Sequence, residues 1–260
     1  MKQLRSWNAV LALAHALQGI AILALANDTT IPITWSFIDG PPASGDVSTD
    51  TLYDLPFGPA VAAFLFLAAI DHGLMAAPRV HRWYERNLDA EMNPARWWEY
   101  SLSASLMIVL IAMLTGIRDV TALIALFGVN AAMILFGLVM ERVNRPGEPV
   151  DWRPFVYGSI VGVAPWLAIA VQLGHAESEA DVPGFVIAIF VTLFLLFFSF
   201  AVNMALQYLR VGRGAAISSV SVVISCSAWS QRARSPGRCS QALWRASRSS
   251  SGSRGLADRR

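Results

Sequence analysis

Four ionisable side chains fall inside long apolar stretches of the chain, and they are the residues best placed to do chemistry. His15 lies midway along the first stretch, Asp71 and His72 are neighbours in the second, and Glu99 begins the third. Ionisable groups at membrane depth are costly, and they commonly serve proton paths or the binding of a charged ligand. These four residues are therefore the candidate functional set.

Two of these residues also have a plain structural interpretation. His15 could pack against a neighbouring helix through a hydrogen bond, or it could belong to a proton relay in a wet cavity. Glu99 could be a solvated carboxylate near the inner membrane surface, or it could face a ligand pocket. The spacing suits a pocket, because Glu99, Ser103 and Met107 recur every fourth residue and so share one helix face.

Adjacent residues on a helix point about 100° apart, so Asp71 and His72 need not face the same cavity. We expect His72 to point inward and leave the direction of Asp71 open. Asn130 and Asn203 add uncharged polar groups to the fourth and sixth apolar stretches.

Six apolar stretches are long enough to position these residues inside a membrane. A helix needs about 20 mostly apolar residues to cross a bilayer, and it satisfies its own backbone groups while doing so. The mean hydropathy of +0.49 is too high for an ordinary soluble domain. We predict an all-α membrane protein with six clear transmembrane helices. They cover Ser6–Ala26, Phe57–Ala77, Trp97–Ile117, Val120–Met140, Pro154–Leu173 and Val182–Leu209.

Basic residues gather on alternate connections between these stretches. By the positive-inside rule, that side faces the cytoplasm, so we predict a multi-pass protein of the cell membrane with a cytoplasmic N-terminus. The basic residues are Lys2, Arg5, Arg79, Arg82, Arg86, Arg96, Arg142, Arg145 and Arg153. The opposite connections, residues 28–56 and 174–181, are acidic, and Arg118 is the exception among them.

The long connection at residues 28–56 has the composition of a β-hairpin. Residues 30–38 are rich in β-branched and aromatic side chains, and residues 39–42, Asp-Gly-Pro-Pro, favour a turn. We expect a short hairpin that lies over the outer face of the helices.

The composition changes abruptly after Val211. Residues 212–260 contain thirteen serines, nine arginines and one acidic residue, whereas the rest of the chain has 11 basic and 17 acidic residues, a net charge of −6. The basic balance of the whole chain therefore comes from the tail and does not indicate a nucleic-acid partner. We predict two parts, a transmembrane bundle at 1–211 and a tail at 212–260 that is disordered or frame-shifted.

Several short runs resemble the heliorhodopsin family of retinal proteins. The most specific is RWWEYSLSAS at 96–105, and the others are HALQG at 15–19, ITWSF at 33–37, DH at 71–72 and NMALQY at 203–208. Together they cover about Ser6–Val211. Members of this family have their N-terminus in the cytoplasm, which the charge pattern of this chain indicates independently.

The resemblance implies a rhodopsin-like bundle that binds retinal and senses light rather than pumping ions. Glu99 would be the counterion of a protonated retinal Schiff base, because a buried cationic imine needs a nearby anion. His15 and His72 would line a polar cavity beside it, and Ser103 and Met107 would line the pocket. The implied partners are the lipid bilayer and, by analogy with the family alone, a second copy of the chain.

The chain departs from the family at the seventh helix, whose lysine holds retinal. The only lysine in the sequence is Lys2, at the opposite end of the chain. Shifted by one base, the codons for 216–241 can encode an apolar helix that contains Ser-Leu-Val-Ala-Lys-Ser. The lysine codon would straddle Gln231 and Arg232. We hypothesise a one-base frame error near Val211–Ala216; the alternative is a genuinely divergent tail.

Two other functions stay open at this stage. One is a retinal-free membrane scaffold that keeps the bundle, and the other is a small proton-coupled transporter that uses the four ionisable residues. The transporter lacks the paired discontinuous helices and internal symmetry typical of that class. No nucleophile motif, phosphate-binding loop or metal-ligand spacing points to an enzyme or a metal site.

Overall fold

The computed structural model describes residues 2–43, 45–90, 92–145, 148–179, 182 and 184–209. The chain divides into two compact units, Met1–Ser218 and Ser219–Arg260, and every described residue belongs to the first. The predicted tail lies outside the described residues, as do Gln231 and Arg232. The predicted boundary after Val211 therefore stays a prediction.

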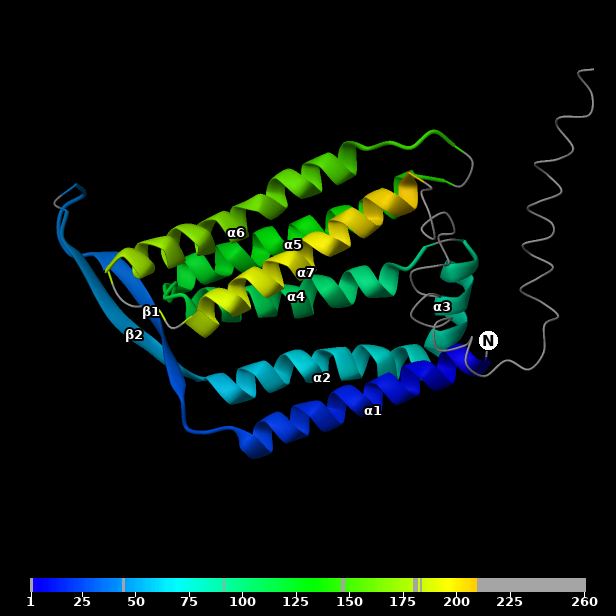
Figure 1. Cartoon of the computed structure of the whole chain (residues 1–260), viewed down its shortest axis with the longest axis horizontal. Helices are drawn as coiled ribbons and strands as arrows, with labels where there is room; N and C mark the ends of the chain where they lie inside the picture. The colour runs from blue at the N-terminus through cyan, green and yellow to red at the C-terminus, as the bar shows by residue number, and fades with distance from the viewer. Residues whose placement is uncertain are drawn as a thin grey trace, which may run out of the picture. The chain divides into compact units, whose positions relative to one another are not determined.

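Seven helices and one two-stranded sheet make up the described part of the chain (Figure 1). In chain order they are α1 (Lys2–Leu25), β1 (Thr30–Ile38), β2 (Val47–Pro56), α2 (Phe57–Ala76), α3 (Pro78–Asp89), α4 (Pro94–Leu114), α5 (Val120–Val143), α6 (Arg153–Glu179) and α7 (Gly184–Tyr208).

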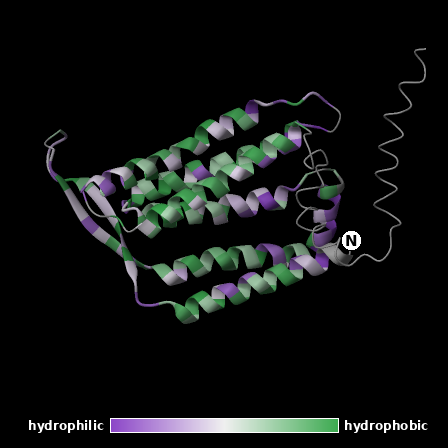
Figure 2. Cartoon of the chain, viewed as in Figure 1, coloured by the Kyte–Doolittle hydropathy of each residue, from purple (hydrophilic) through white to green (hydrophobic). Residues whose placement is uncertain are grey.

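Six of these helices are long and apolar enough to cross a membrane, which confirms the predicted helical membrane bundle. Figure 2 shows that hydrophobic residues dominate the spanning helices, with hydrophilic residues at a few positions inside them. Apolar side chains surround these helices instead of forming one stripe, as expected where one side faces protein and the other faces lipid.

Among the helix boundaries that differ from the sequence-based expectation, two change the place of named acidic residues. α4 begins at Pro94, so Glu99 lies in its second turn and not at its start. Asn93 caps this helix by accepting a hydrogen bond from the backbone N–H of Arg96, and Pro94 suits the first helical position. α6 continues to Glu179, so Glu177 and Glu179 belong to a helix and not to the connection expected at 174–181.

The short helix α3 was not predicted. Its residues are polar on average, so it gives no hydropathy signal, and it lies between two spans separated by only 17 residues. It begins at Pro78, directly after Ala77 ends α2, because proline starts a helix readily and cannot continue one.

Neighbouring helices in the sequence are also neighbours in space. α1 packs along α2, α2 contacts α4, α4 packs along α5, and α5 packs along α6 (Figure 1). The main core cluster joins α4, α5 and α6 through buried residues that include Ile108, Leu123, Trp166 and Ile169. The helix that carries Glu99 is thus fixed from two sides by α2 and α5.

The predicted hairpin is confirmed as an antiparallel pair of β1 and β2, with an irregularity in the register between Ile33 and Thr34. Ile31 is buried in the main core cluster, so the base of the hairpin belongs to the helical bundle. Asp119, which caps α5, also accepts a hydrogen bond of 3.0 Å from the backbone N–H of Ser36. This contact fastens the hairpin to the connection between α4 and α5.

Candidate functional site

The two predicted cavity histidines meet face to face between α1 and α2. The rings of His15 and His72 are stacked, with centroids 5.5 Å apart and planes 8° from parallel. His72 Nδ1 lies 3.1 Å from Oδ1 of Asn8, which is buried in α1. His72 therefore points toward α1, and the chain places three polar side chains together at membrane depth.

Asp71 faces another direction, as its position next to His72 on the helix requires. Its charge acts on Glu99 and Tyr100, both of which lie on α4. His72 thus lies toward α1, and Asp71 is near enough to α4 for its charge to act on Glu99. Two polar groups result, one between α1 and α2 and the other between α2 and α4.

Glu99 and Ser103 lie one turn apart on α4, and the Ser103 hydroxyl is near enough to the Glu99 carboxylate to stabilise its charge. Ser103 is buried and Glu99 is half-buried, so this pair lies on a side of α4 that is turned toward protein. Met107, one turn further along, packs against the main core cluster. Glu99, Ser103 and Met107 therefore share a side of α4 that is turned toward protein, and their role as a ligand pocket stays a prediction.

A buried ion pair fixes the start of α4 and with it the position of Glu99. Glu141 near the end of α5 accepts a hydrogen bond of 2.8 Å from Nη2 of Arg96 through Oε1. Its other oxygen, Oε2, accepts a bond of 2.8 Å from the backbone N–H of Asn93. The Arg96 guanidinium also lies 4.5 Å from the ring centroid of Trp97. Glu99 lies three residues after Arg96, less than one helical turn from this ion pair.

Aromatic side chains form an apolar wall further along the bundle. The ring of Trp166 on α6 contacts three phenylalanines of α7, Phe190, Phe194 and Phe197, at centroid distances of 5.2–5.7 Å. Trp166 belongs to the same core cluster that Met107 packs against. This arrangement could bind an apolar ligand or simply join the two helices.

The predicted polar site Asn130 is fully buried in α5 and donates a hydrogen bond of 3.0 Å from Nδ2 to Ser105 on α4. Its Oδ1 has no hydrogen-bond partner within the described residues. Buried acceptors are nearly always satisfied, so this oxygen can take a bond from a water molecule or from a further segment.

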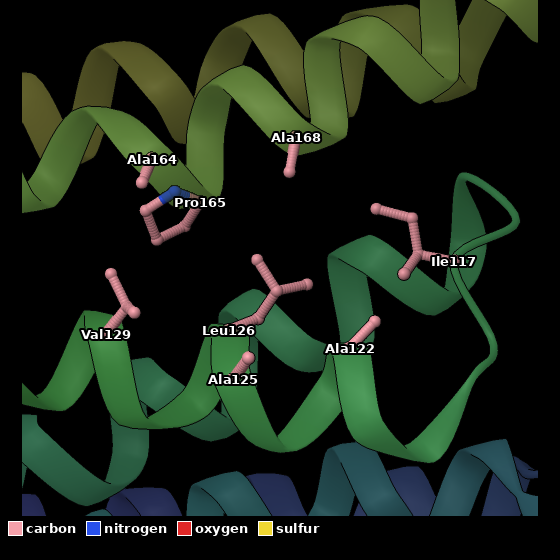
Figure 3. Close-up of a pocket in the computed structure, with 8 residues that line it drawn as sticks. All are labelled: Ile117, Ala122, Ala125, Leu126, Val129, Ala164, Pro165 and Ala168. Atoms are coloured by element: carbon pink, nitrogen blue, oxygen red, sulfur yellow. The ribbon is translucent and has the colours of Figure 1, made fainter. Parts of the chain in front are cut away.

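An apolar cavity of about 340 Å³ opens between α5 and α6 (Figure 3). Leu126 and Val129 of α5 point toward Pro165 of α6 in this view. None of the ionisable candidates lines the cavity, which contains no charged side chain. It is therefore separate from the polar site.

Two residues of the site were missed in the sequence. Asn8 lies seven residues before His15, a spacing that places both on one helix face, so the i, i+7 pattern was a usable signal. Glu141 lies one residue beyond the predicted span Val120–Met140, whereas in the structure it belongs to α5. Its burial depends on the approach of Arg96, 45 residues away, which no local pattern shows.

A comparison with models of known protein families identifies the family to which this chain is similar. The family model described as Heliorhodopsin matches residues 4–226, which is most of the chain. The match begins close to the predicted start of the resemblance at Ser6 and continues past its predicted end at Val211. No curated protein matches the chain significantly.

Proposed function

Because the chain belongs to the heliorhodopsin family, we propose that its gene encodes a light-sensing retinal protein in which Glu99 balances the positive charge of the chromophore linkage. The chain is a multi-pass membrane protein. The proposal adds a sensory role rather than ion pumping, and a cytoplasmic N-terminus in the cell membrane. The observation that carries it is the Glu99–Ser103 pair on the protein-facing side of α4.

The residues present supply only part of a retinal site. Glu99 supplies a carboxylate, Ser103 a hydroxyl that steadies it, and His15 and His72 a polar group on the other side of α2. The primary amine needed for covalent attachment is absent, since Lys2 is the only lysine and stands at the start of α1. The chain as written therefore does not fit covalently bound retinal.

When bound, retinal supplies the absorption of light and a change of shape. The chain supplies charge balance at Glu99 and groups that can hold or pass a proton. Asp71 is close enough for its charge to act on Glu99.

The decisive experiment compares two proteins mixed with all-trans retinal, the chain as written and a version with the reading frame restored after Val211. We expect no stable visible absorption band from the chain as written and a band from the restored protein. Glu99→Gln in the restored protein should move that band, because the charge next to the chromophore changes. Glu177→Gln, at the far end of α6, is the matched control and should leave the band in place.

Two outcomes would contradict the proposal. A colourless restored protein would favour a retinal-free scaffold or a proton-coupled transporter. A CAG codon at Gln231 in the gene would remove the lysine codon and with it the frame hypothesis, leaving the divergent tail.

A further inference from the structure

The helix α3 is held at the membrane surface by its two neighbours. It starts one residue after α2 ends and stops four residues before α4 begins, and both of these helices span the membrane. Figure 1 shows it crossing the ends of the bundle, at the same end as the N-terminus. Such short links leave α3 no room to move away from the lipid headgroups, which add about 5–7 Å to each side of the hydrocarbon.

One face of α3 packs against the bundle. Tyr84 is buried in a small cluster with Met75 of α2 and Ala95 of α4, and Val80 and Leu88 pack against the same cluster. The ring of His81 is also buried, where its Nδ1 lies 3.0 Å from the carbonyl oxygen of Met75. The orientation of the helix about its own axis is therefore fixed.

The opposite face carries three arginines. Arg79, Arg82 and Arg86 are all exposed, and at about 100° per residue they lie within about 60° of one another. The same spacing puts Tyr84 about 165° from the middle of this arginine face. Trp83 lies beside it and is 38% exposed. Within the side chains that the structure describes, none of the three arginines forms an ion pair.

The positive-inside rule alone does not account for this arrangement. That rule depends on the number of basic residues in a connection and not on where they point. A topology signal would be satisfied by arginines on any exposed part of the helix. Here they share one side, directly opposite the packed side, with a tryptophan next to them. Tryptophan is enriched at the boundary between lipid and water.

We propose that the arginine face of α3, formed by Arg79, Arg82 and Arg86, binds the phosphate groups of anionic phospholipids in the adjoining leaflet. Guanidinium groups bind phosphate oxygens through two parallel hydrogen bonds, which favours arginine for this contact. The charges are complementary, the depth is that of the headgroups, and the arginines have no described partner of their own. The inference is independent of retinal.

The test measures binding of phosphatidylglycerol and phosphatidylcholine to the purified full-length chain by native mass spectrometry. The variant Arg82→Gln/Arg86→Gln should lower the affinity for phosphatidylglycerol about tenfold or more, since it removes the charge-assisted hydrogen bonds of two guanidinium groups to the lipid phosphate. Its affinity for phosphatidylcholine should not change.

The matched control is Arg142→Gln/Arg145→Gln, which removes the same charge from exposed residues at the same end of the molecule. It should change phosphatidylglycerol binding less than twofold. Arg82→Lys/Arg86→Lys should give an affinity between those of the unchanged chain and the glutamine variant, because lysine keeps the charge but cannot form the two parallel hydrogen bonds. An unchanged affinity in the α3 variant would overturn the proposal and favour an acidic protein partner. Equal losses of phosphatidylglycerol affinity in both glutamine variants would also overturn the proposal, because binding would then depend on total positive charge and not on the arginine face of α3.

Discussion

At the scale of single residues, the buried carboxylate of Glu141 is expected to contribute to stability. Its carboxylate is 5% exposed and binds both the Arg96 guanidinium and the backbone N–H of Asn93. Removing one partner of a buried ion pair leaves the other charge without compensation. We expect Glu141→Ala to lower the free energy of unfolding by about 3 kcal/mol, the lower end of the usual range because Arg96 stays partly exposed. Denaturant titration in mixed micelles measures this change.

The ion pair of Asp151 with Arg153 provides the comparison, because Arg153 is 77% exposed and the distance of 2.6 Å is just as short. Exposed pairs contribute little, so Asp151→Ala should lower the free energy of unfolding far less than Glu141→Ala. Equal losses from the two alanine variants would show that burial is not what makes Glu141 important.

Asp119 makes the docking of the hairpin dependent on pH. Hydrogen bonds lower the pKa of its carboxyl to about 2, first from the Thr121 side chain and then from backbone N–H groups that include Ser36. A lowered pKa in the folded state means that stability is present above the ordinary carboxyl pKa and is lost as the pH falls toward 2. We expect protection of the Ser36 amide, measured by hydrogen exchange and corrected for intrinsic rates, to fall between pH 4 and pH 2. Asp119→Asn should remove this pH dependence, and a dependence that persists would assign it to another group.

At the scale of the helices, the approach of α4 to α5 depends on the absence of a side chain at Gly137. A Cβ atom there would overlap the ring of Trp97. We expect Gly137→Ala to lower the free energy of unfolding by about 1–3 kcal/mol, the usual cost of overpacking. Gly128, on the same helix, has nothing within 4 Å of its Cβ position, so Gly128→Ala should stabilise the helix by up to about 1 kcal/mol. Thermal unfolding of the two variants checks the opposite signs, and shifts of the same sign would contradict the packing argument.

The sequence predicts elements well where one physical rule dominates. The spans follow from apolar length, and the hairpin follows from β-branched residues before a turn. The amphipathic helix α3 was not predicted, because its residues are polar on average and the packed face formed by Val80, Tyr84 and Leu88 gives no hydropathy signal. Contacts between distant elements, such as Arg96 with Glu141, depend on which helices become neighbours. For the same reason the sequence predicts the angle of about 100° between Asp71 and His72 but not which neighbouring helix His72 meets.

At the scale of the whole bundle, the first and last described helices have the least support. The extensive contact of α1 is with α2, and α7 has few contacts with α6 beyond the aromatic wall. Gln207 is the one buried residue among those described for α7. A helix placed against both α1 and α7 would close the bundle, and the frame hypothesis supplies such a helix in the restored protein.

The orientation of the bundle can be tested without any chromophore. The hairpin and the connection after α5 lie at opposite ends of the spans, so a probe at each distinguishes the two faces (Figure 1). In a chain with Cys226→Ser and Cys239→Ser, a membrane-impermeant maleimide should label Asp50→Cys on intact cells. It should label Arg145→Cys only after the membrane is permeabilised, because arginine-rich connections stay in the cytoplasm. The reverse pattern would place the N-terminus outside the cell. The orientation predicted from the basic connections would then be wrong, and the charge pattern would no longer support the family resemblance.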